Sequence, residues 1–280
     1  MFLNLSQDLK FGAIAGKMAG VEKIIYRRGS AIPIKDRFYN KFLLNSCVTD
    51  IIANSRATKK TILQNTGDWL NEEKITVIYN GIKIGDIDKR SKSGGSIRKE
   101  LGINAETTLI ANVGQLTPQK GHKYLFRAVK ILSEKVKDFK ILVIGTGELE
   151  NELKNMVERM EISGYVVFTG FRDDVYSILS EVDLVLHTPL WEGFCYVVAE
   201  AMALARPVVC TDVSNIGEIM IDGETGYLAR AKDPDDIARN TVKMLNNPDK
   251  NKFGDKGRQV IEDNFTFEKM IREIEDLILQ

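Results

Sequence analysis

The chain has 280 residues, 44% of them hydrophobic, which is enough for one large or two ordinary globular domains with buried cores. Its 39 basic and 39 acidic side chains cancel, and no apolar run approaches the roughly 20 residues that a membrane-spanning helix needs. The sequence therefore predicts a globular protein without a transmembrane helix, and no nucleic-acid partner is expected.

The distribution of charge and the cysteines indicate possible partners and the cellular compartment. Residues 1–60 hold eleven Lys or Arg and four Asp or Glu, a net of +7 that the remainder balances. This segment suits an anionic lipid or partner surface, and equally an ordinary solvated basic face. Cys47, Cys195 and Cys210 lack metal-ligand spacing, which predicts reduced thiols in a cytoplasmic protein, peripheral at most to the inner face of the membrane.

Residues 5–19 are expected to form an amphipathic helix. Gln7, Asp8 and Lys10 interrupt their apolar residues at the place where a secretory signal would keep an unbroken apolar core. Further along, strands are predicted at 23–28 (KIIYRR), 48–55 (VTDIIANS) and 75–80 (ITVIYN), with helices around 37–45 and after Ser55. Three strands are too few for a doubly wound domain, so this part is interpreted as a remnant of one.

After a polar, Gly/Ser-rich stretch the alternation of strands and helices is complete. Strands are predicted at 108–114 (TLIANVG), 140–147 (KILVIGTG), 165–170 (YVVFTG), 183–188 (DLVLHT) and 207–212 (PVVCTD), and the last helices at 234–246, 250–261 and 266–279. Five strands with helical crossovers predict a doubly wound parallel sheet. We therefore expect a partial Rossmann-like domain (1–82), a linker (83–96), a complete Rossmann-like domain (97–265) and a C-terminal helix (266–280) that packs back toward the first part.

Ligands of open parallel sheets bind at the carboxyl ends of the strands, so the residues that follow each strand are the candidates for chemistry. Gln115 and Lys120 follow the first strand of the complete domain; on this fragment alone a solvated lysine is favoured over a phosphate ligand. Gly145 and Gly147 follow the second strand, where a plain tight turn is the better interpretation of the pair taken alone.

The stretch WEGFCYVVAEAMALARPVV, which begins at Trp191, is more informative. A helix is expected to start near Gly193 or Phe194, and its first amide groups would favour an anion. Glu192 lies just before this helix, where an acidic residue is favourable in any case. Glu200 lies about two turns along an apolar helix, so its carboxylate needs a hydrogen-bond donor, for which a sugar hydroxyl is suitable. A nucleotide sugar fits this arrangement.

Together these residues resemble the retaining, nucleotide-sugar-dependent glycosyltransferases of family four, which have the GT-B fold of two facing Rossmann-like domains. The similarity runs from about Val21 to the C-terminus. It rests on YNGI (79–82), VGQLTPQKG (113–121), VIGTGELENEL (143–153), FTGFRDDV (168–175), HTPLWEGFCYVVAEAMALARPVVCTD (187–212) and DGETGYLA (222–229), in this order.

The resemblance implies roles for individual residues. Lys120 matches the lysine that contacts the donor diphosphate, and Glu192 matches the first glutamate of the family motif, near the donor sugar; both are expected to be catalytic. Glu200 matches the second glutamate, which holds ribose hydroxyls. The expected donor-binding residues are Gln115, Gly145, Gly147, Phe171, Arg172, Gly193, Phe194, Cys195, Tyr196 and Glu200.

The sequence also departs from the family pattern. Gln115 stands where an arginine is usual, so one positive group remains where the family generally has two. Ser214 to Glu218 replace a Gly-Gly-x-Pro-Glu segment. Members carry about a hundred more residues before the point that matches Met1, so the chain is expected to bind a nucleotide diphosphate weakly and to transfer little sugar alone, with a separate chain as one source of the missing half.

The predicted function is therefore that of the donor-binding half of a retaining glycosyltransferase. It would transfer a sugar from a nucleotide-diphosphate sugar, a UDP-sugar by family frequency, to a glycan or lipid-linked acceptor. Neither a metal nor another cofactor is implied, and the basic first segment would supply any peripheral membrane contact. The alternative is a non-catalytic subunit that binds nucleotide sugar or acts as a scaffold.

Overall fold

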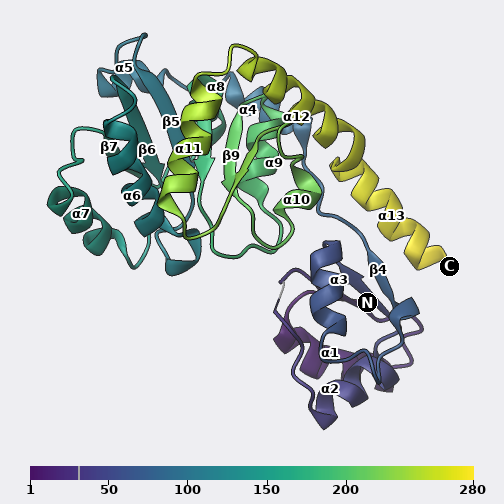
Figure 1. Ribbon diagram of the computed structural model, residues 1–280. Helices are drawn as coiled ribbons and strands as arrows, with labels where there is room; N and C mark the ends of the chain where they lie inside the picture. The colour runs from purple at the N-terminus through teal and green to yellow at the C-terminus, as the bar shows by residue number, and fades with distance from the viewer. Residues whose placement is uncertain (31) are drawn as a thin grey trace. The chain divides into compact units, whose positions relative to one another are not determined.

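The computed structural model describes residues 1–30 and 32–280, which form two compact units (Figure 1). The first unit contains Met1–Gly81, the short segment Glu192–Phe194 and Phe267–Gln280, and the second contains Ile82–Trp191 and Cys195–Thr266. No helix in the described part of the chain combines the length and the apolar composition needed to cross a bilayer. Each unit is an α/β structure built on its own parallel sheet.

The sheet of the first unit has the order β1-β2-β3-β4, with every pair parallel. Its elements are β1 (Phe2–Leu3), α1 (Ser6–Met18), β2 (Ile25–Arg28), α2 (Phe38–Phe42), a π-helical turn (Leu43–Cys47), β3 (Asp50–Ala53), α3 (Arg56–Leu63), a 3-10 turn (Glu72–Lys74) and β4 (Ile75–Val77). The three expected strands are present, and β1 is an addition.

Strand β3 shows why Ile51, Ile52 and Ala53 are apolar at three successive positions. Ile51 packs in the cluster that includes Leu9 and Ala13 of α1, whereas its neighbour Ile52 packs with Leu277. Successive side chains of a strand point to opposite faces, so both faces of this sheet are covered. Ser55 then caps α3, because its side-chain oxygen accepts a hydrogen bond from the Thr58 amide at 3.0 Å.

The helix that covers the second face comes from the far end of the chain. It is α13 (Phe267–Leu279), whose side chains Met270, Ile274 and Leu277 pack with Ile25, Ile52 and Ile78 of the first unit. Its sequence places apolar residues three or four positions apart, which gives one apolar face to bury. The last helix thus belongs to the first unit.

The second unit has a six-stranded parallel sheet in the order β10-β9-β8-β5-β6-β7. The strands are β5 (Thr108–Val113), β6 (Phe139–Ile144), β7 (Val166–Gly170), β8 (Leu184–His187), β9 (Val208–Thr211) and β10 (Tyr227–Ala229). The predicted count of five strands was one too low, because β10 has only three residues. Strand order reverses between β5 and β8, which places the switch point of the sheet there.

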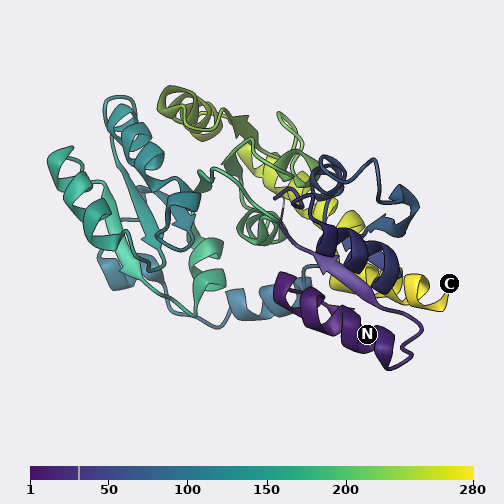
Figure 2. The ribbon, with the colours of Figure 1, turned by 90° about the horizontal axis from the view of Figure 1, so that it is seen from below.

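Helices cover both faces of this sheet (Figures 1 and 2). They are α4 (Ile84–Ser91), α5 (Ile97–Leu101), α6 (His122–Ser133), α7 (Glu150–Arg159), α8 (Val175–Glu181), α9 (Tyr196–Ala203), α10 (Ile216–Ile219), α11 (Pro234–Leu245) and α12 (Lys250–Asn264). The main core joins α6, α7 and α11 to one face of the sheet, with Phe126, Ile141 and Ile237 among its buried side chains.

Helix α4 lies within residues 83–96, the stretch predicted to be a linker. Only Ile84 and Ile87 are apolar in this helix, too few to produce a visible stripe, yet Ile87 is buried. The carboxylate of Asp88 accepts hydrogen bonds from two guanidinium nitrogens of Arg258 in α12, at 2.9 and 2.8 Å. Arg258 also donates to the Ala203 carbonyl at the end of α9. Tertiary contacts therefore supply the stability that the local pattern lacks.

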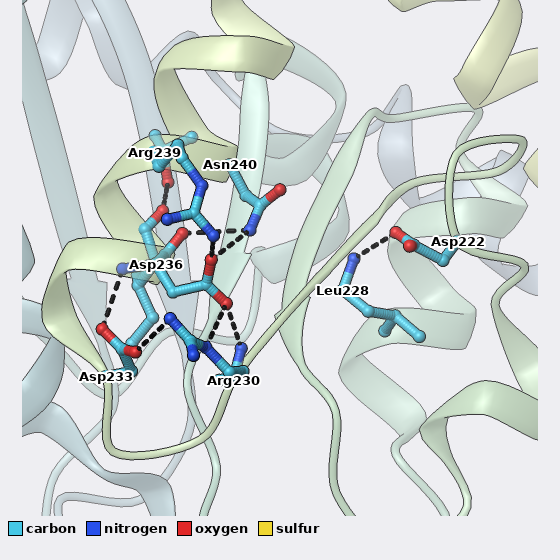
Figure 3. A network of polar contacts seen from close by, with 9 residues as sticks. Asp222, Leu228, Arg230, Asp233, Asp236, Arg239 and Asn240 are labelled. Carbon is cyan, nitrogen blue, oxygen red and sulfur yellow. Dashed lines mark hydrogen bonds and ion pairs between the residues drawn. The ribbon is translucent and has the colours of Figure 1, made fainter.

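The start of α11 is fixed by a polar network (Figure 3). Asp233 is the N-cap and accepts from the Asp236 amide at 3.0 Å. The buried Asp236 carboxylate accepts in turn from the Arg230 amide at 2.7 Å, from Asn240 and from the Arg239 guanidinium. These contacts join the end of β10 to α11.

Candidate donor site

The loops after β5 and β8, the strands that flank the switch point, are joined to each other. The Leu190 amide donates to the Gln119 carbonyl at 2.7 Å, and the Gln119 side chain donates to the Trp191 carbonyl at 2.9 Å. Deeper in the sheet, Asn112 of β5 donates to the Leu186 carbonyl of β8 at 2.8 Å. The two loops therefore form a fixed rim at the carboxyl edge of the sheet.

Lys120 lies in this rim at the end of a 3-10 turn (Pro118–Lys120). The side chain is half-buried, and its stem packs close to Gly114, so the ammonium group is held near the end of β5. Gln115 lies at the start of the same loop with its side chain exposed. The residue after Lys120, Gly121, has φ +67°, and a Cβ there would lie 2.1 Å from the Thr188 carbonyl oxygen. Only glycine permits this approach of the two loops.

The structure gives Gly145 and Gly147 a packing reason to be glycine. A Cβ at Gly145 would lie 2.1 Å from the Gly114 carbonyl oxygen, and one at Gly147 would lie 2.5 Å from that of Leu116. The Leu116 amide also donates to the Thr146 carbonyl at 3.0 Å. The glycines let the loop after β6 pack against the loop after β5, which positions the rim.

Phe171 and Arg172 follow β7 and line a hollow of about 500 Å³, together with Arg90 and Tyr176. Phe171 is 77% exposed, so its ring is available for stacking. Arg172 is engaged: it donates to Glu100 at 2.7 and 2.8 Å and to Asp174 at 2.8 Å. The hydrogen bonds that Arg172 donates to these carboxylates, to Asp174 first and then to Glu100, raise the pKa of Arg172 and fix the guanidinium at the wall of the hollow.

Glu200 has a partner that the sequence did not suggest. The Tyr176 hydroxyl donates to its Oε1 at 2.8 Å, and the Arg90 guanidinium lies 4.7 Å from the centroid of the Tyr176 ring. Burial raises the pKa of Glu200, and the hydrogen bond from Tyr176 opposes that shift. Burial, followed by the charge of Glu200, raises the pKa of Tyr176 to about 12. A carboxylate thus lies beside the hollow that Phe171 and Arg172 line.

The helix that carries Glu200, α9, begins at Tyr196, two or three residues later than expected. Cys195 occupies the N-cap position and is buried, whereas Tyr196 is 46% exposed. Glu192 and Phe194, which belong to the first unit, are both buried, and Gly193 is half-buried. Sequence reasoning missed Tyr176 and Arg90: the first had no motif, and the second fell in the expected linker.

Comparison with known proteins also indicates a glycosyltransferase. Residues 95–260 match the family model described as glycosyl transferases group 1. The UDP-Gal:alpha-D-GlcNAc-diphosphoundecaprenol alpha-1,3-galactosyltransferase of Escherichia coli is 25% identical over 279 residues, covering 96% of this chain and 72% of that protein. The capsular polysaccharide biosynthesis glycosyltransferase CapM of Staphylococcus aureus is 28% identical over 235 residues, covering 82% of this chain and 61% of that protein.

The fold has solved counterparts. The crystal structure of Anabaena Alr3699/HepE in complex with UDP and glucose superposes with a TM-score of 0.84 at 22% identity, over 99% of this chain and 77% of that one. Sucrose-phosphate synthase from Thermosynechococcus elongatus gives a TM-score of 0.78 at 17% identity, over 100% and 72%. With the family model covering more than half of its residues, this chain belongs to the glycosyl transferases group 1 family of glycosyltransferases and has the GT-B fold.

Proposed function

We propose that the protein transfers a sugar from a UDP-sugar to a glycan or lipid-linked acceptor, with retention of the anomeric configuration. The observation that carries the proposal is the rim at the switch point, where Lys120 lies in a loop fixed by the loop after β8. A lysine held at the carboxyl edge of a doubly wound sheet suits a diphosphate, which develops negative charge when its bond to the sugar breaks.

The hollow beside Phe171 and the carboxylate of Glu200 support a nucleoside at the same edge. An exposed ring can stack on a base, and a carboxylate accepts more than one hydrogen bond, so a ribose hydroxyl can bind beside the Tyr176 hydroxyl. The choice of uridine is supported by similar proteins only: the E. coli relative is named for UDP-Gal, and HepE was solved with UDP. The lipid-linked acceptor is likewise supported by the diphosphoundecaprenol in the name of that relative.

Our proposal includes catalysis without a metal, by Lys120 and Glu192. The chain has two Asp-x-Asp sequences, at 86–88 and 233–235, whose carboxylates are possible metal ligands. In each of these sequences, one of the two aspartates already has a structural partner. Asp88 pairs with Arg258, and Asp233 caps α11. The proposal predicts that transfer continues in the presence of EDTA.

Titration calorimetry with UDP, GDP and ADP tests donor binding. UDP should give the tightest binding, and Lys120→Ala or Glu200→Ala should weaken it by about 1–3 kcal/mol, the value of a hydrogen bond to a charged group. Lys135→Ala, a change of the same type at an exposed site on the same unit, is the control. If Lys120→Ala and Glu200→Ala bind UDP as the unaltered chain does, the donor site lies elsewhere.

Transfer is tested separately, by proton NMR of the product formed from an α-linked UDP-sugar. The product should be α-linked, and Glu192→Gln should reduce the rate without a matching loss of UDP binding. A β-linked product would exclude retention.

A further inference from the structure

The first unit contains a hollow of about 300 Å³ whose charged lining is entirely positive. It lies among α1, β2, α2 and the segment that follows β2. The cations are Lys10, Arg28, Lys35 and Arg37, and Ser6, Tyr26, Tyr39 and Asn40 add hydroxyl and amide groups. Among the described residues, no Asp or Glu lines it.

Two acidic side chains next to the lining residues in the sequence, Asp8 and Asp36, are already engaged. Asp8 of α1 accepts from the amides of Leu5 and Asn4, at 2.9 and 3.3 Å, and so caps its own helix. Asp36 pairs with Lys41 at 2.9 Å. Within residues 1–30 and 32–280, none of the four cations that line the hollow forms an ion pair. Four like charges without a counter-charge repel one another, which an anion in the hollow would relieve.

Arg28 is the best-fixed of these cations. It is the last residue of β2, and its Nη1 donates to the Tyr26 hydroxyl at 3.1 Å, while Nη2 donates to the Ile32 carbonyl. Its Nε is buried and has no hydrogen-bond acceptor among the described residues. A guanidinium that its own unit holds at the wall of the hollow is suited to bind a planar or tetrahedral oxyanion.

A second hollow, of about 420 Å³, adjoins the first and shares Ser6, Tyr26 and Arg28 with it. Arg28 is the only charged residue in its described lining, which also includes Leu5 and Ile32, 63% and 59% exposed. A ligand with its anionic group among the four cations can therefore place an uncharged portion alongside.

We propose that the hollow of the first unit, distinct from the candidate donor site of the second, binds the phosphate or diphosphate group of a phosphorylated ligand. Assigning that ligand as the acceptor of sugar transfer rests on the proposed function, whereas the anion site does not. The group reaches the site either on a soluble molecule or as part of a lipid head group.

Calorimetric titration of the full chain with inorganic pyrophosphate tests the site. The titration is done in Lys120→Ala, so that the candidate donor site contributes little. Arg28→Gln and Arg37→Gln should each weaken binding about tenfold or more, as expected for loss of a charged hydrogen bond. Lys60→Gln removes an equal charge from an exposed position of α3 in the same unit and should leave binding within twofold. Equal affinities for all variants would overturn the proposal, as would an equal loss in Lys60→Gln.

Because Arg28 also bonds to Tyr26 and the Ile32 carbonyl, its replacement could disturb folding. Arg37 is exposed, and no side-chain hydrogen bond or ion pair of Arg37 occurs among the described residues, so the Arg37→Gln result stands independently. If the unaltered chain does not bind UDP but pyrophosphate still binds in Lys120→Ala, the proposed donor is refuted and the anion site is retained.

Vesicles distinguish the source of the group. Binding to phosphatidylglycerol vesicles that pyrophosphate displaces, and that Arg37→Gln removes, supports the site with a lipid head group as its ligand. Pyrophosphate binding without vesicle binding supports it with a soluble phosphorylated ligand.

Discussion

At the scale of single residues, the Tyr176–Glu200 hydrogen bond makes a measurable prediction. Its removal in Tyr176→Phe leaves a largely buried carboxylate without this donor, so the pKa of Glu200 should rise further. A carboxyl group whose pKa is raised by folding favours the native state below its unfolded pKa and loses that contribution as pH rises through the folded pKa. We expect a cost of about 1–3 kcal/mol at pH 7 and a smaller one near pH 4.5, measured by urea unfolding.

Tyr165→Phe is the matched control, because the Tyr165 ring stacks on Phe139 and its hydroxyl has no described hydrogen bond. It should cost little at either pH. A Tyr176→Phe cost that does not change with pH would mean that the hydroxyl stabilises packing rather than the charged carboxylate.

His122 gives the second prediction at this scale. Burial, with smaller contributions from His187 and Lys120, lowers its pKa from 6.5 to about 4. The unfolded chain therefore takes up a proton between these values that the native chain does not, and stability falls as pH decreases from 6.5 toward 4. The loss should approach about 3 kcal/mol at the lower pH. His122→Leu should flatten this part of the stability–pH profile; an unchanged slope would assign it to other groups.

The residues of the site differ in how far sequence could predict them. Lys120 could be proposed for the site only from the family resemblance, and Glu200 also from the need of a carboxylate in an apolar helix for a hydrogen-bond donor. Tyr176 could not be predicted in this way, because its hydrogen bond joins α8 to Glu200 of α9, which is 24 residues further along the chain. Gly145 and Gly147 were proposed from the family resemblance, and their contacts with the loop after β5 depend on tertiary packing.

At the scale of elements, the start of α11 tests how much a capping network contributes. Asp233→Ala should cost about 1 kcal/mol, the typical value of an N-cap. Asp236→Ala should cost more, because it leaves the Arg230 amide without its acceptor and removes contacts to Asn240 and Arg239. Asp235→Ala, at an exposed position between them, is the control for unfolding measurements. An equal loss of unfolding free energy in all three variants would mean that the stabilisation comes from acidic charge at the helix start and not from these particular hydrogen bonds.

Elements were predictable where the pattern is local. Helix α1 and the longer strands match their predicted positions, since apolar periodicity alone specifies them. The two-residue β1 and three-residue β10 are too short to carry a period, and α4 depends on Asp88, whose partner Arg258 is 170 residues away. Contacts of that separation cannot be read from a local window.

At the scale of the whole molecule, α13 makes the stability of the first unit depend on the end of the chain. Leu277→Ala should destabilise that unit by about 2–5 kcal/mol, as for a buried leucine. Hydrogen exchange should then speed up in β2, β3 and β4 and stay unchanged in β5 to β10. Leu279→Ala, at an 85% exposed position, is the control. Faster exchange in both sheets would mean that the two units unfold together.

The grouping of Phe267–Gln280 with Met1–Gly81 has a consequence during synthesis. A domain made early on the ribosome can usually fold while the rest of the chain is still being translated. Here Ile25, Ile52 and Ile78 are translated long before the helix that shields them. Until residues 267–279 have been translated, that apolar surface lacks the helix that covers it and is open to contact with other chains.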